Sequence, residues 1–193
     1  MNLPRNHFSP SQLTLWEKSP KAYVDVYINN KPIFETVYLK YGKRFSEDME
    51  QGFSDDPIIN EMVHKVERGV VPEYLIKVPY LDTTLLGIED SENLDRFLEY
   101  KTGTVVWTQE TADNSAQLHF YAFIRKRMGY KIYNQAKLIW LPTHFKEGRY
   151  EFTGEIKEFE VNVTEEQITN IEKRIVKALK EIKAYKIKGS ITL

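Results

Sequence analysis

The sequence predicts a mixed α/β fold, in which a central mixed β-sheet is flanked by helices. Apolar residues recur at helical spacing near both ends of the chain. The middle of the chain is instead rich in β-forming residues with turn-like breaks, and helical and strand patterns alternate after it. No repeat or Pro/Ser-rich linker divides the 193 residues. Because this length suits one ordinary domain, we expect a single domain over residues 1–193.

Helical signals dominate the first third of the chain. Ser9 is a suitable N-cap, Pro10 suits the first helical position, and Gln12 lies where a capping box needs it. A second helix is expected over about 39–52 and a third over 57–68. The apolar stripe of the second helix is Phe45, Met49 and Phe53.

The middle of the chain changes to strand patterns. Short β-rich segments are separated by turn-like residues, which predicts a three-stranded meander. A helix, a strand closed by Pro142, and one or two further strands are expected to follow. In chain order these segments are 73–80, 83–90, 94–102, 115–128, 136–141 and 150–163.

The last helix has the clearest pattern in the sequence. Thr164 and Gln167 form a predicted capping box, and Gly189 is expected to follow the end of the helix. Its expected buried stripe is Ile168, Ile171, Ile175, Leu179 and Ile182.

The composition excludes several kinds of site. The chain has no cysteine, which rules out disulfides, thiolate zinc sites, an iron–sulfur cluster held by cysteines and a cysteine nucleophile. It has four histidines and no H-E-x-x-H pairing, so any metal is expected to be hard and held by oxygen. No apolar run approaches the roughly 20 residues that span a bilayer, and no signal-peptide core is present. We therefore expect a cytoplasmic protein without a membrane partner.

The segments around residues 90 and 101 carry the candidate chemistry. Glu99 and Lys101 share one face of a strand, because strand side chains alternate. If the preceding strand pairs with this one, Asp90 and Glu99 can lie diagonally across the ladder, roughly 7–8 Å apart at Cα. Two such carboxylates suit Mg²⁺, and the Tyr100 carbonyl could add a ligand. Lys101 could then orient water or offset phosphoryl charge.

A Glu-x-Lys triplet by itself has little specificity. Two others, at residues 155–157 and 181–183, are interpreted as a solvated strand face and a solvated helix face. The middle triplet differs in its surroundings, because an acid ends the preceding strand and Thr102-Gly103 follows directly.

In this order the motifs resemble the PD-(D/E)XK nuclease superfamily, specifically its RecB-like branch, which includes CRISPR-associated and phage exonucleases. The resemblance covers nearly the whole chain. Its matching residues, in chain order, are Ser9-Pro10-Ser11-Gln12-Leu13, Ser19-Pro20, Gly42 with Ser46 and Glu50, Gly87 to Asp90, Glu99 to Gly103, and Gln117 with Tyr121.

The resemblance implies a restriction-endonuclease-like core and a Mg²⁺- or Mn²⁺-dependent DNA nuclease. Glu50, Asp90 and Glu99 would lie near the metal, with Lys101 beside it. Two positions depart from the pattern. Ser19 replaces a cysteine that helps to hold an iron–sulfur cluster in some relatives, so that cofactor is not expected. Ser46 replaces the usual histidine, a loss for which Glu47 could substitute.

The helix expected over 115–128 supplies the remaining candidates. Gln117 either braces the active-site strand or touches DNA, and as a purely structural alternative it is a core amide bonded to nearby backbone. Tyr121 is a candidate base-contacting residue, since aromatic rings stack on unpaired bases. Arg125 and Lys126 belong to the densest basic cluster and are candidate phosphate contacts, although charged runs on helices are usually solvated faces.

The predicted function is phosphodiester hydrolysis on DNA, as an exonuclease or an end- or flap-processing enzyme in recombination, repair or phage replication. A recombinase or helicase is a candidate partner. Two alternatives remain open: a catalytically inactive relative that binds nucleic acid, and a plain α/β interaction domain whose charged hairpin is a solvated edge.

Overall fold

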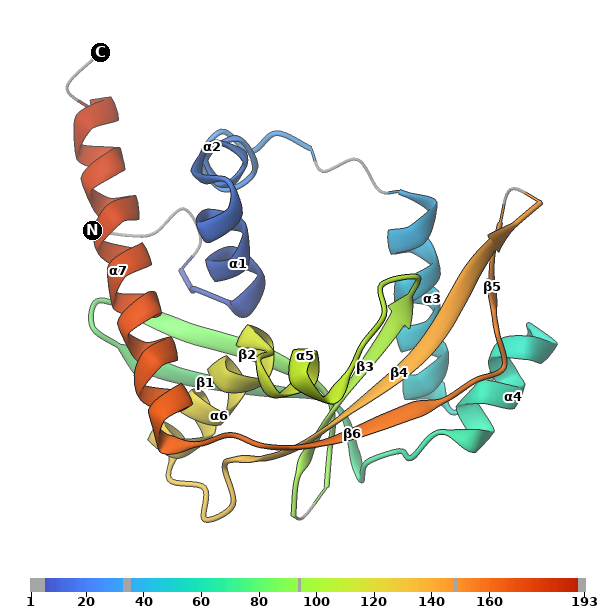
Figure 1. Ribbon diagram of the computed structural model, residues 1–193. Coiled ribbons are helices and arrows are strands. Elements are labelled where there is room, and N and C mark those ends of the chain that lie inside the picture. The colour runs from blue at the N-terminus through green and yellow to red at the C-terminus, as the bar shows by residue number, and fades with distance from the viewer. Residues whose placement is uncertain (1–5, 33–35, 94, 148, 191–193) are drawn as a thin grey trace.

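The computed structural model describes residues 6–32, 36–93, 95–147 and 149–190 (Figure 1). The helical elements are α1 (Pro10–Lys18), α2 (Pro20–Tyr23), the π-helical turn η1 (Val24–Ile28), α3 (Val37–Gln51), α4 (Pro57–Lys65), α5 (Gln109–Asp113), α6 (Ala116–Met128) and α7 (Glu165–Ser190). The strands are β1 (Val71–Tyr80), β2 (Thr83–Glu92), β3 (Phe97–Gly103), β4 (Gln135–Lys146), β5 (Arg149–Phe152) and β6 (Lys157–Asn162).

Within these described ranges the strands form one six-stranded mixed sheet. Its order is β1-β2-β3-β4-β5, and β6 also pairs with β4. The first three strands are the predicted antiparallel meander, whereas β3 and β4 run parallel because α5 and α6 return the chain between them. The predicted fold class, a mixed sheet flanked by helices, is confirmed.

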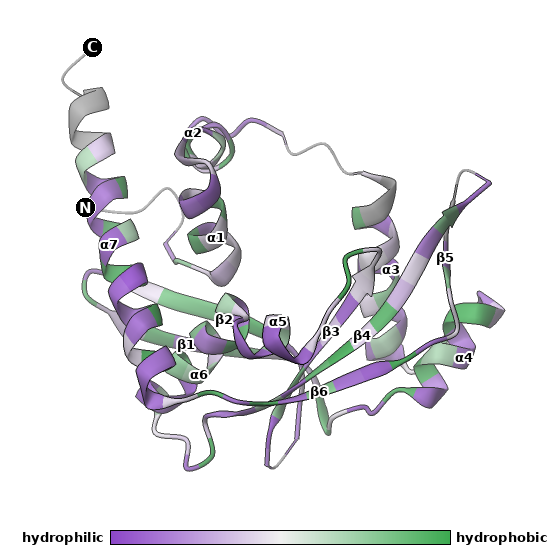
Figure 2. Cartoon of the chain, in the orientation of Figure 1, coloured by the Kyte–Doolittle hydropathy of each residue, from purple (hydrophilic) through white to green (hydrophobic). Residues whose placement is uncertain are grey.

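The sheet separates two apolar cores. The larger core packs α1, α6 and α7 against β1, β2 and one face of β3 and β4, whereas the smaller core packs α3 and α4 against the opposite face. Alternation along β4 shows the division, because Leu138 and Trp140 enter the larger core while Ile139 and Leu141 enter the smaller one. Figure 2 shows the corresponding hydrophobic stretches along the strands. All five residues of the stripe predicted for the last helix are buried.

Several predicted boundaries differ from the structure, among them the end of the third helix, which is Lys65 instead of residue 68, and the ends of β4 and α7. Strand β4 passes through Pro142 and continues to Lys146, because Pro142 still pairs with Gly103 and its carbonyl accepts the N–H of Thr153. Helix α7 includes Gly189 and ends at Ser190. Its predicted capping box is present, since Thr164 and Gln167 each accept a backbone N–H from the other.

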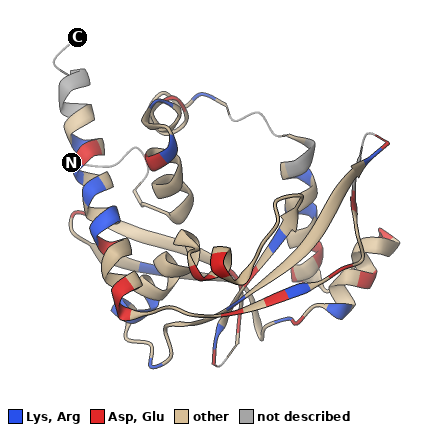
Figure 3. Cartoon of the chain, in the orientation of Figure 1, with Lys and Arg blue, Asp and Glu red and all other residues tan. Residues whose placement is uncertain are grey.

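None of the helices in the described ranges is both long enough and apolar enough to cross a membrane. Figure 3 shows many basic residues along α7. Two of them bind acids elsewhere in the chain: Arg174 forms a two-bond pair with Glu17 of α1, and Lys183 contacts Asp82 in the turn between β1 and β2. These contacts hold α7 against the rest of the fold.

Candidate active site

The acidic centre begins where strands β2 and β3 separate. In the described part of these strands, backbone pairing joins Ser91 to Leu98 and Glu92 to Phe97, and it stops before Asp90. The Oδ2 atom of Asp90 instead accepts the backbone N–H of Tyr100 at 2.7 Å. The carboxylate of Asp90 thereby takes the place of a strand hydrogen bond and is held beside β3.

Glu99, Lys101 and Gln117 converge next to this carboxylate. Glu99 and Lys101 come from alternate positions of β3 and share a face, as predicted, and Gln117 comes from the first turn of α6. The Nζ atom of Lys101 donates to Glu99 Oε1 at 2.5 Å and to Gln117 Oε1 at 2.8 Å. Because the side chain of Glu99 is only 3% exposed, the charged hairpin is not a solvated edge.

A chain of hydrogen bonds connects Lys101 to the backbone of β2. The Nε2 atom of Gln117 donates to the hydroxyl of Tyr121 at 2.8 Å, and that hydroxyl donates to the Ile88 carbonyl at 2.5 Å. Gln117 therefore links Lys101 to Tyr121, and the expected roles of Gln117, bracing the active-site strand or touching DNA, stay predictions.

The carboxylates at this centre carry more negative charge than the site neutralises. Burial raises the pKa of Asp90 well above its usual range, and the negative charge of Glu99 raises it further, against the lowering by Lys101 and the Tyr100 N–H. Burial also raises the pKa of Glu99, although Lys101 and Gln117 lower it. The site therefore favours an additional positive charge.

The donor atoms fit a hard divalent cation such as Mg²⁺ or Mn²⁺. The Oε2 atom of Glu99 is buried without a hydrogen-bond partner in the described part of the chain, and a coordinated ion would satisfy it. Mg²⁺ commonly takes one or two carboxylates, with water and substrate phosphate as its other ligands. The Tyr100 carbonyl projects from the same edge of β3 as its N–H, which faces Asp90, and its role as a ligand stays a prediction.

Glu50, the third predicted carboxylate ligand, does not join this pair. No cluster of three or more His, Cys, Asp or Glu side chains that could hold an ion is found in the described residues. Helix α3 turns Phe45 and Met49 into the smaller core, and Glu50, the next position, is exposed because each helical residue is rotated by about 100° from the last. Glu47 is exposed as well and lies 3.8 Å from Lys43. The predicted three-carboxylate set is therefore corrected to Asp90 and Glu99.

Gly87 lets Tyr121 approach β2 closely. A Cβ atom at residue 87 would lie 2.6 Å from Cε1 and 2.8 Å from Cδ1 of the Tyr121 ring, which is closer than van der Waals contact allows. The glycine in the Gly-x-x-Asp pattern is thus explained by packing. It permits the ring position from which Tyr121 bonds to Ile88 and Gln117.

We expect Gly87→Ala to reduce the free energy of unfolding by about 1–3 kcal/mol, the usual effect of overpacking a well-packed site. Urea unfolding measures this change. Gly87→Ala combined with Tyr121→Leu should recover part of the stability, because the smaller side chain leaves room for the new methyl group. A single variant within about 0.5 kcal/mol of wild type would contradict the close packing.

The predicted DNA contact by Arg125 is wrong for the described structure. Its guanidinium is 2% exposed and forms a two-bond ion pair with Glu89, which is fully buried. The arginine faces the sheet because it lies one helical turn beyond Tyr121 on α6. Burial raises the pKa of Glu89 to about 7 even though Arg125 acts to lower it. This pairing also separates the roles of the neighbouring acids, since Glu89 is held in the core and Asp90 lies at the site.

The other two predicted DNA contacts differ in exposure. The Tyr121 side chain is largely buried and its hydroxyl is engaged within the protein, so the placement favours a bracing role over base stacking. Lys126 lies on the exposed side of α6, where it pairs with Glu165 at 2.5 Å. Its contact with phosphate stays a prediction.

A groove of about 640 Å³ runs along the site between α1, β2 and the start of α6. Leu86 and Ile88 contribute apolar surface, and Lys18 contributes a basic side chain. The groove also contains hydroxyl groups from the predicted Ser-x-Ser motif and the following turn of α1, namely Ser9, Ser11 and Thr14. Gln117 and Tyr121 line it too, so the groove leads to the residues that hold Lys101.

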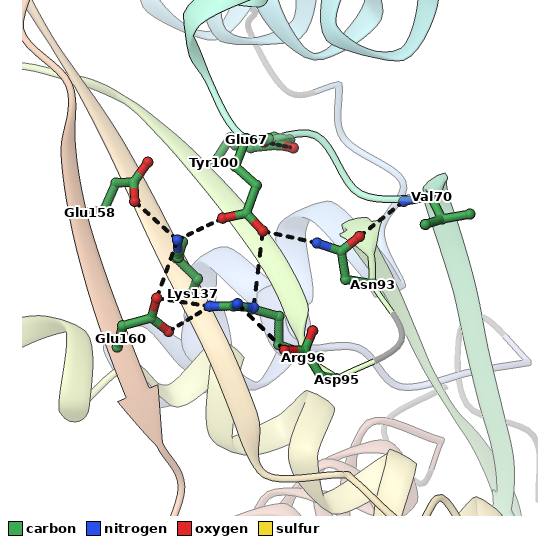
Figure 4. A network of polar contacts seen from close by, with 9 residues as sticks. All are labelled: Glu67, Val70, Asn93, Asp95, Arg96, Tyr100, Lys137, Glu158 and Glu160. Atoms are coloured by element: carbon green, nitrogen blue, oxygen red, sulfur yellow. Dashed lines mark hydrogen bonds and ion pairs between the residues drawn. The ribbon is translucent and has the colours of Figure 1, made fainter.

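A charged network supports Tyr100 beside the smaller core (Figure 4). The Tyr100 hydroxyl donates to the carbonyl of Glu67 at 2.8 Å, in the segment between α4 and β1. Lys137 of β4, only 8% exposed, lies 2.6 Å from the Glu67 carboxylate and also pairs with Glu158 and Glu160 of β6. This network fixes Tyr100, whose N–H holds Asp90.

Sequence reasoning missed two ion pairs around the site, Glu67 with Lys137 and Glu89 with Arg125. Glu67 carried no local motif, and its role depends on tertiary pairing with Lys137. The partnership of Glu89 with Arg125 had one usable signal: Gln117, Tyr121 and Arg125 follow one another at four-residue spacing and therefore share a helix face.

Similarity to known proteins is found at the level of structure. No protein-family model matches the sequence, and no curated protein matches it. The crystal structure of a candidate exonuclease from Eubacterium rectale superposes with a TM-score of 0.59 at 9% identity, covering 93% of this chain and 82% of that one. LHK-Exo in complex with dAMP superposes with a TM-score of 0.58 at 10% identity, covering 98% and 96%. The chain shares their fold.

Proposed function

We propose that this protein is a Mg²⁺- or Mn²⁺-dependent deoxyribonuclease of the PD-(D/E)XK type. The observation that carries the proposal is the half-buried carboxylate of Asp90 next to the buried carboxylate of Glu99, with the Lys101 ammonium hydrogen-bonded to Glu99. The fold shared with a structure described as an exonuclease, and with LHK-Exo, supports it. The dAMP in one of them supports a nucleotide substrate.

The reaction is hydrolysis of a phosphodiester. The oxygen of water forms a bond to phosphorus, the bond from phosphorus to the leaving sugar oxygen breaks, and a proton passes to that oxygen. Asp90 and Glu99 would hold the divalent ion, which would supply positive charge to offset the phosphoryl oxygens and to lower the pKa of water. Lys101 orients the water or offsets charge on the phosphoryl group.

The remaining polar residues keep Lys101 in one position. Gln117 accepts from its ammonium, and Tyr121 ties Gln117 to β2. Such fixed geometry contributes to catalysis because a misplacement of about 1 Å costs roughly 100-fold in rate. The groove beside α1 is the path we propose for the DNA strand.

Within this activity we propose exonucleolytic or end- and flap-processing action in recombination, repair or phage replication. A recombinase or helicase partner and a cytoplasmic location belong to the same proposal. The neighbour described as an exonuclease supports the exonucleolytic part of this proposal.

The test is digestion of end-labelled linear DNA by purified protein, in Mg²⁺, in Mn²⁺ and in EDTA. We expect metal-dependent cleavage that Glu99→Gln abolishes. Glu155→Gln is the matched control, because Glu155 occupies the same position of another Glu-x-Lys triplet and is 63% exposed. Equal rates for wild type and Glu99→Gln would refute the proposal.

A second candidate is an inactive relative that binds nucleic acid. Ser46 at the usual histidine position and the exposed location of Glu50 favour it. This candidate predicts DNA binding that is insensitive to Asp90→Asn and to Glu99→Gln, with no cleavage under Mn²⁺.

A further inference from the structure

Arg125 forms ion pairs with two carboxylates on strand β2. Its Nε and Nη2 atoms donate to Glu89 at 2.7 and 2.6 Å, and Nη2 also lies 3.2 Å from Glu92. Glu89 and Glu92 stand on either side of Asp90 along the strand. A single guanidinium on α6 is therefore bound to β2 both before and after the candidate metal ligand.

The same guanidinium also contacts β3. Its Cζ atom lies 4.9 Å from the centre of the Phe97 ring and 5.0 Å from that of Tyr130. Phe97 pairs with Glu92 in the short ladder between β2 and β3. Arg125 thus joins the two strands at the point from which they separate.

Asp90 itself lies where strand pairing is interrupted on both sides. In the described part of β1 and β2, Pro72 pairs with Ser91 and Tyr74 with Glu89, but Glu73 and Asp90 between them are not a ladder pair. Glu73 has a φ of 45°, which is unusual for a residue other than glycine. Such local distortions recur beside functional sites and persist only where their surroundings hold them.

We propose that Arg125 is a positioning residue for Asp90. By binding Glu89, Glu92 and the Phe97 ring together, it holds the distorted end of β2 at the distance from which the Asp90 carboxylate reaches the Tyr100 N–H. The part of this inference that concerns the metal rests on the proposed function. The part that concerns the Asp90–Tyr100 hydrogen bond does not.

A purely structural ion pair would behave differently when it is replaced. Apolar residues of similar volume often match or exceed the stability of a buried ion pair, whereas removal of one partner leaves a buried charge unpaired. The double variant Glu89→Leu/Arg125→Met removes both charges at once. It therefore tests whether the pair directs the Asp90 side chain, without the loss of stability that an unpaired Glu89 or Arg125 would cause.

The first measurement is hydrogen exchange of backbone amides by NMR in metal-free protein. We expect the Tyr100 amide of the double variant to exchange about tenfold faster or more than in wild type, because its bond to a carboxylate is loosened. Amides of β4 that pair with β6 should be unchanged. If the double variant does not fold, Arg125→Lys replaces it in this measurement. Lysine keeps the charge without the two-bond geometry, so the Tyr100 amide should again exchange faster than in wild type.

The second measurement is the Mg²⁺ concentration for half-maximal cleavage. We expect it to rise by about 10-fold to 100-fold in the double variant, with the KM for DNA within about twofold of wild type. The matched control is Glu17→Leu/Arg174→Met, which removes another two-bond Arg–Glu pair that lies between α1 and α7. The control should keep the wild-type Mg²⁺ requirement.

An unchanged Tyr100 exchange rate in both Arg125 variants would overturn the positioning role, whether or not the protein cleaves DNA. A wild-type protein that cleaves no DNA would refute the proposed function and leave the exchange result standing. A folded double variant with the wild-type exchange rate at Tyr100 and the wild-type Mg²⁺ requirement would show that the Arg125–Glu89 pair does not position Asp90.

Discussion

Replacement of Lys101 by methionine is expected to lower the rate of DNA cleavage by about 10²–10⁴-fold. Lys101 is the only described cation that hydrogen-bonds to Glu99, and methionine keeps most of its length without the charge. The variant loses the group that we propose orients water or offsets phosphoryl charge. The ion would still have both carboxylates, so binding of Mn²⁺ should be affected much less than the rate.

Single-turnover cleavage at saturating Mg²⁺ measures this effect without a contribution from product release. Lys157→Met is the matched control, since Lys157 ends another Glu-x-Lys triplet of this chain and is 49% exposed. We expect wild-type rates from it. A Lys101→Met protein that cleaves within about threefold of wild type would remove lysine from the proposed mechanism.

The contrast between these two triplets shows how much of the site could be predicted. Alternation places Glu99 and Lys101 on one face wherever the strand lies, so this local geometry could be predicted from the sequence. The closeness of Asp90 to β3 was expected from the adjacent strand, but the hydrogen bond from the Tyr100 N–H to the Asp90 carboxylate was not, because the strand ladder stops before Asp90. The burial of Glu99 depends on the cover over β3, whereas Glu155 is exposed because it lies in the connection between β5 and β6.

Glu50 and Arg125 show where sequence reasoning fails. Each lies on a correctly predicted helix, but its role depends on the rotation of that helix about its axis against the sheet. Met49 and Phe45 anchor α3 so that Glu50 faces outward, and Tyr121 anchors α6 so that Arg125 faces inward. Neither rotation is fixed by local pattern, because it is decided by packing against residues distant in sequence.

The parallel pairing of β3 with β4 could not be predicted from local sequence patterns either. The predicted order of elements allowed a mixed sheet, but the partner of each strand after the meander was not specified. Strand β4 has almost no alternation in polarity because both of its faces are covered, one by each core. Pro142 was therefore taken as the end of a strand that in fact continues.

We expect Asp90→Asn to abolish metal-dependent cleavage and yet to stabilise the metal-free protein at neutral pH. Burial and the charge of Glu99 raise the pKa of Asp90 in the folded state. The folded state therefore binds a proton more tightly than the unfolded state does. Stability from this group is greatest at low pH and is lost as the pH rises from the unfolded pKa of about 4 towards the folded pKa.

Asparagine removes the charge and keeps an oxygen that can accept the Tyr100 N–H. We expect a gain at pH 7, because ionisation of the wild-type carboxyl opposes folding when its folded-state pKa is raised. The gain should shrink as the pH falls and vanish well below the unfolded pKa of about 4, where the wild-type carboxyl is protonated in both states. Urea unfolding in EDTA across this pH range measures it, and Asp55→Asn, at an 85% exposed side chain, should stay within about 0.5 kcal/mol of wild type.

Added Mg²⁺ should make wild type more stable than Asp90→Asn, the reverse of their order in EDTA. An ion that binds only the folded state stabilises it in proportion to the logarithm of ion concentration over Kd, and wild type has both carboxylates for this purpose while Asp90→Asn has one. Wild type should therefore gain stability with added Mg²⁺, and the variant should gain little. If Asp90→Asn is less stable than wild type in EDTA at pH 7, the charge of Glu99 does not oppose ionisation of Asp90 as the structure indicates, and the case for a cation at this pair of carboxylates is lost.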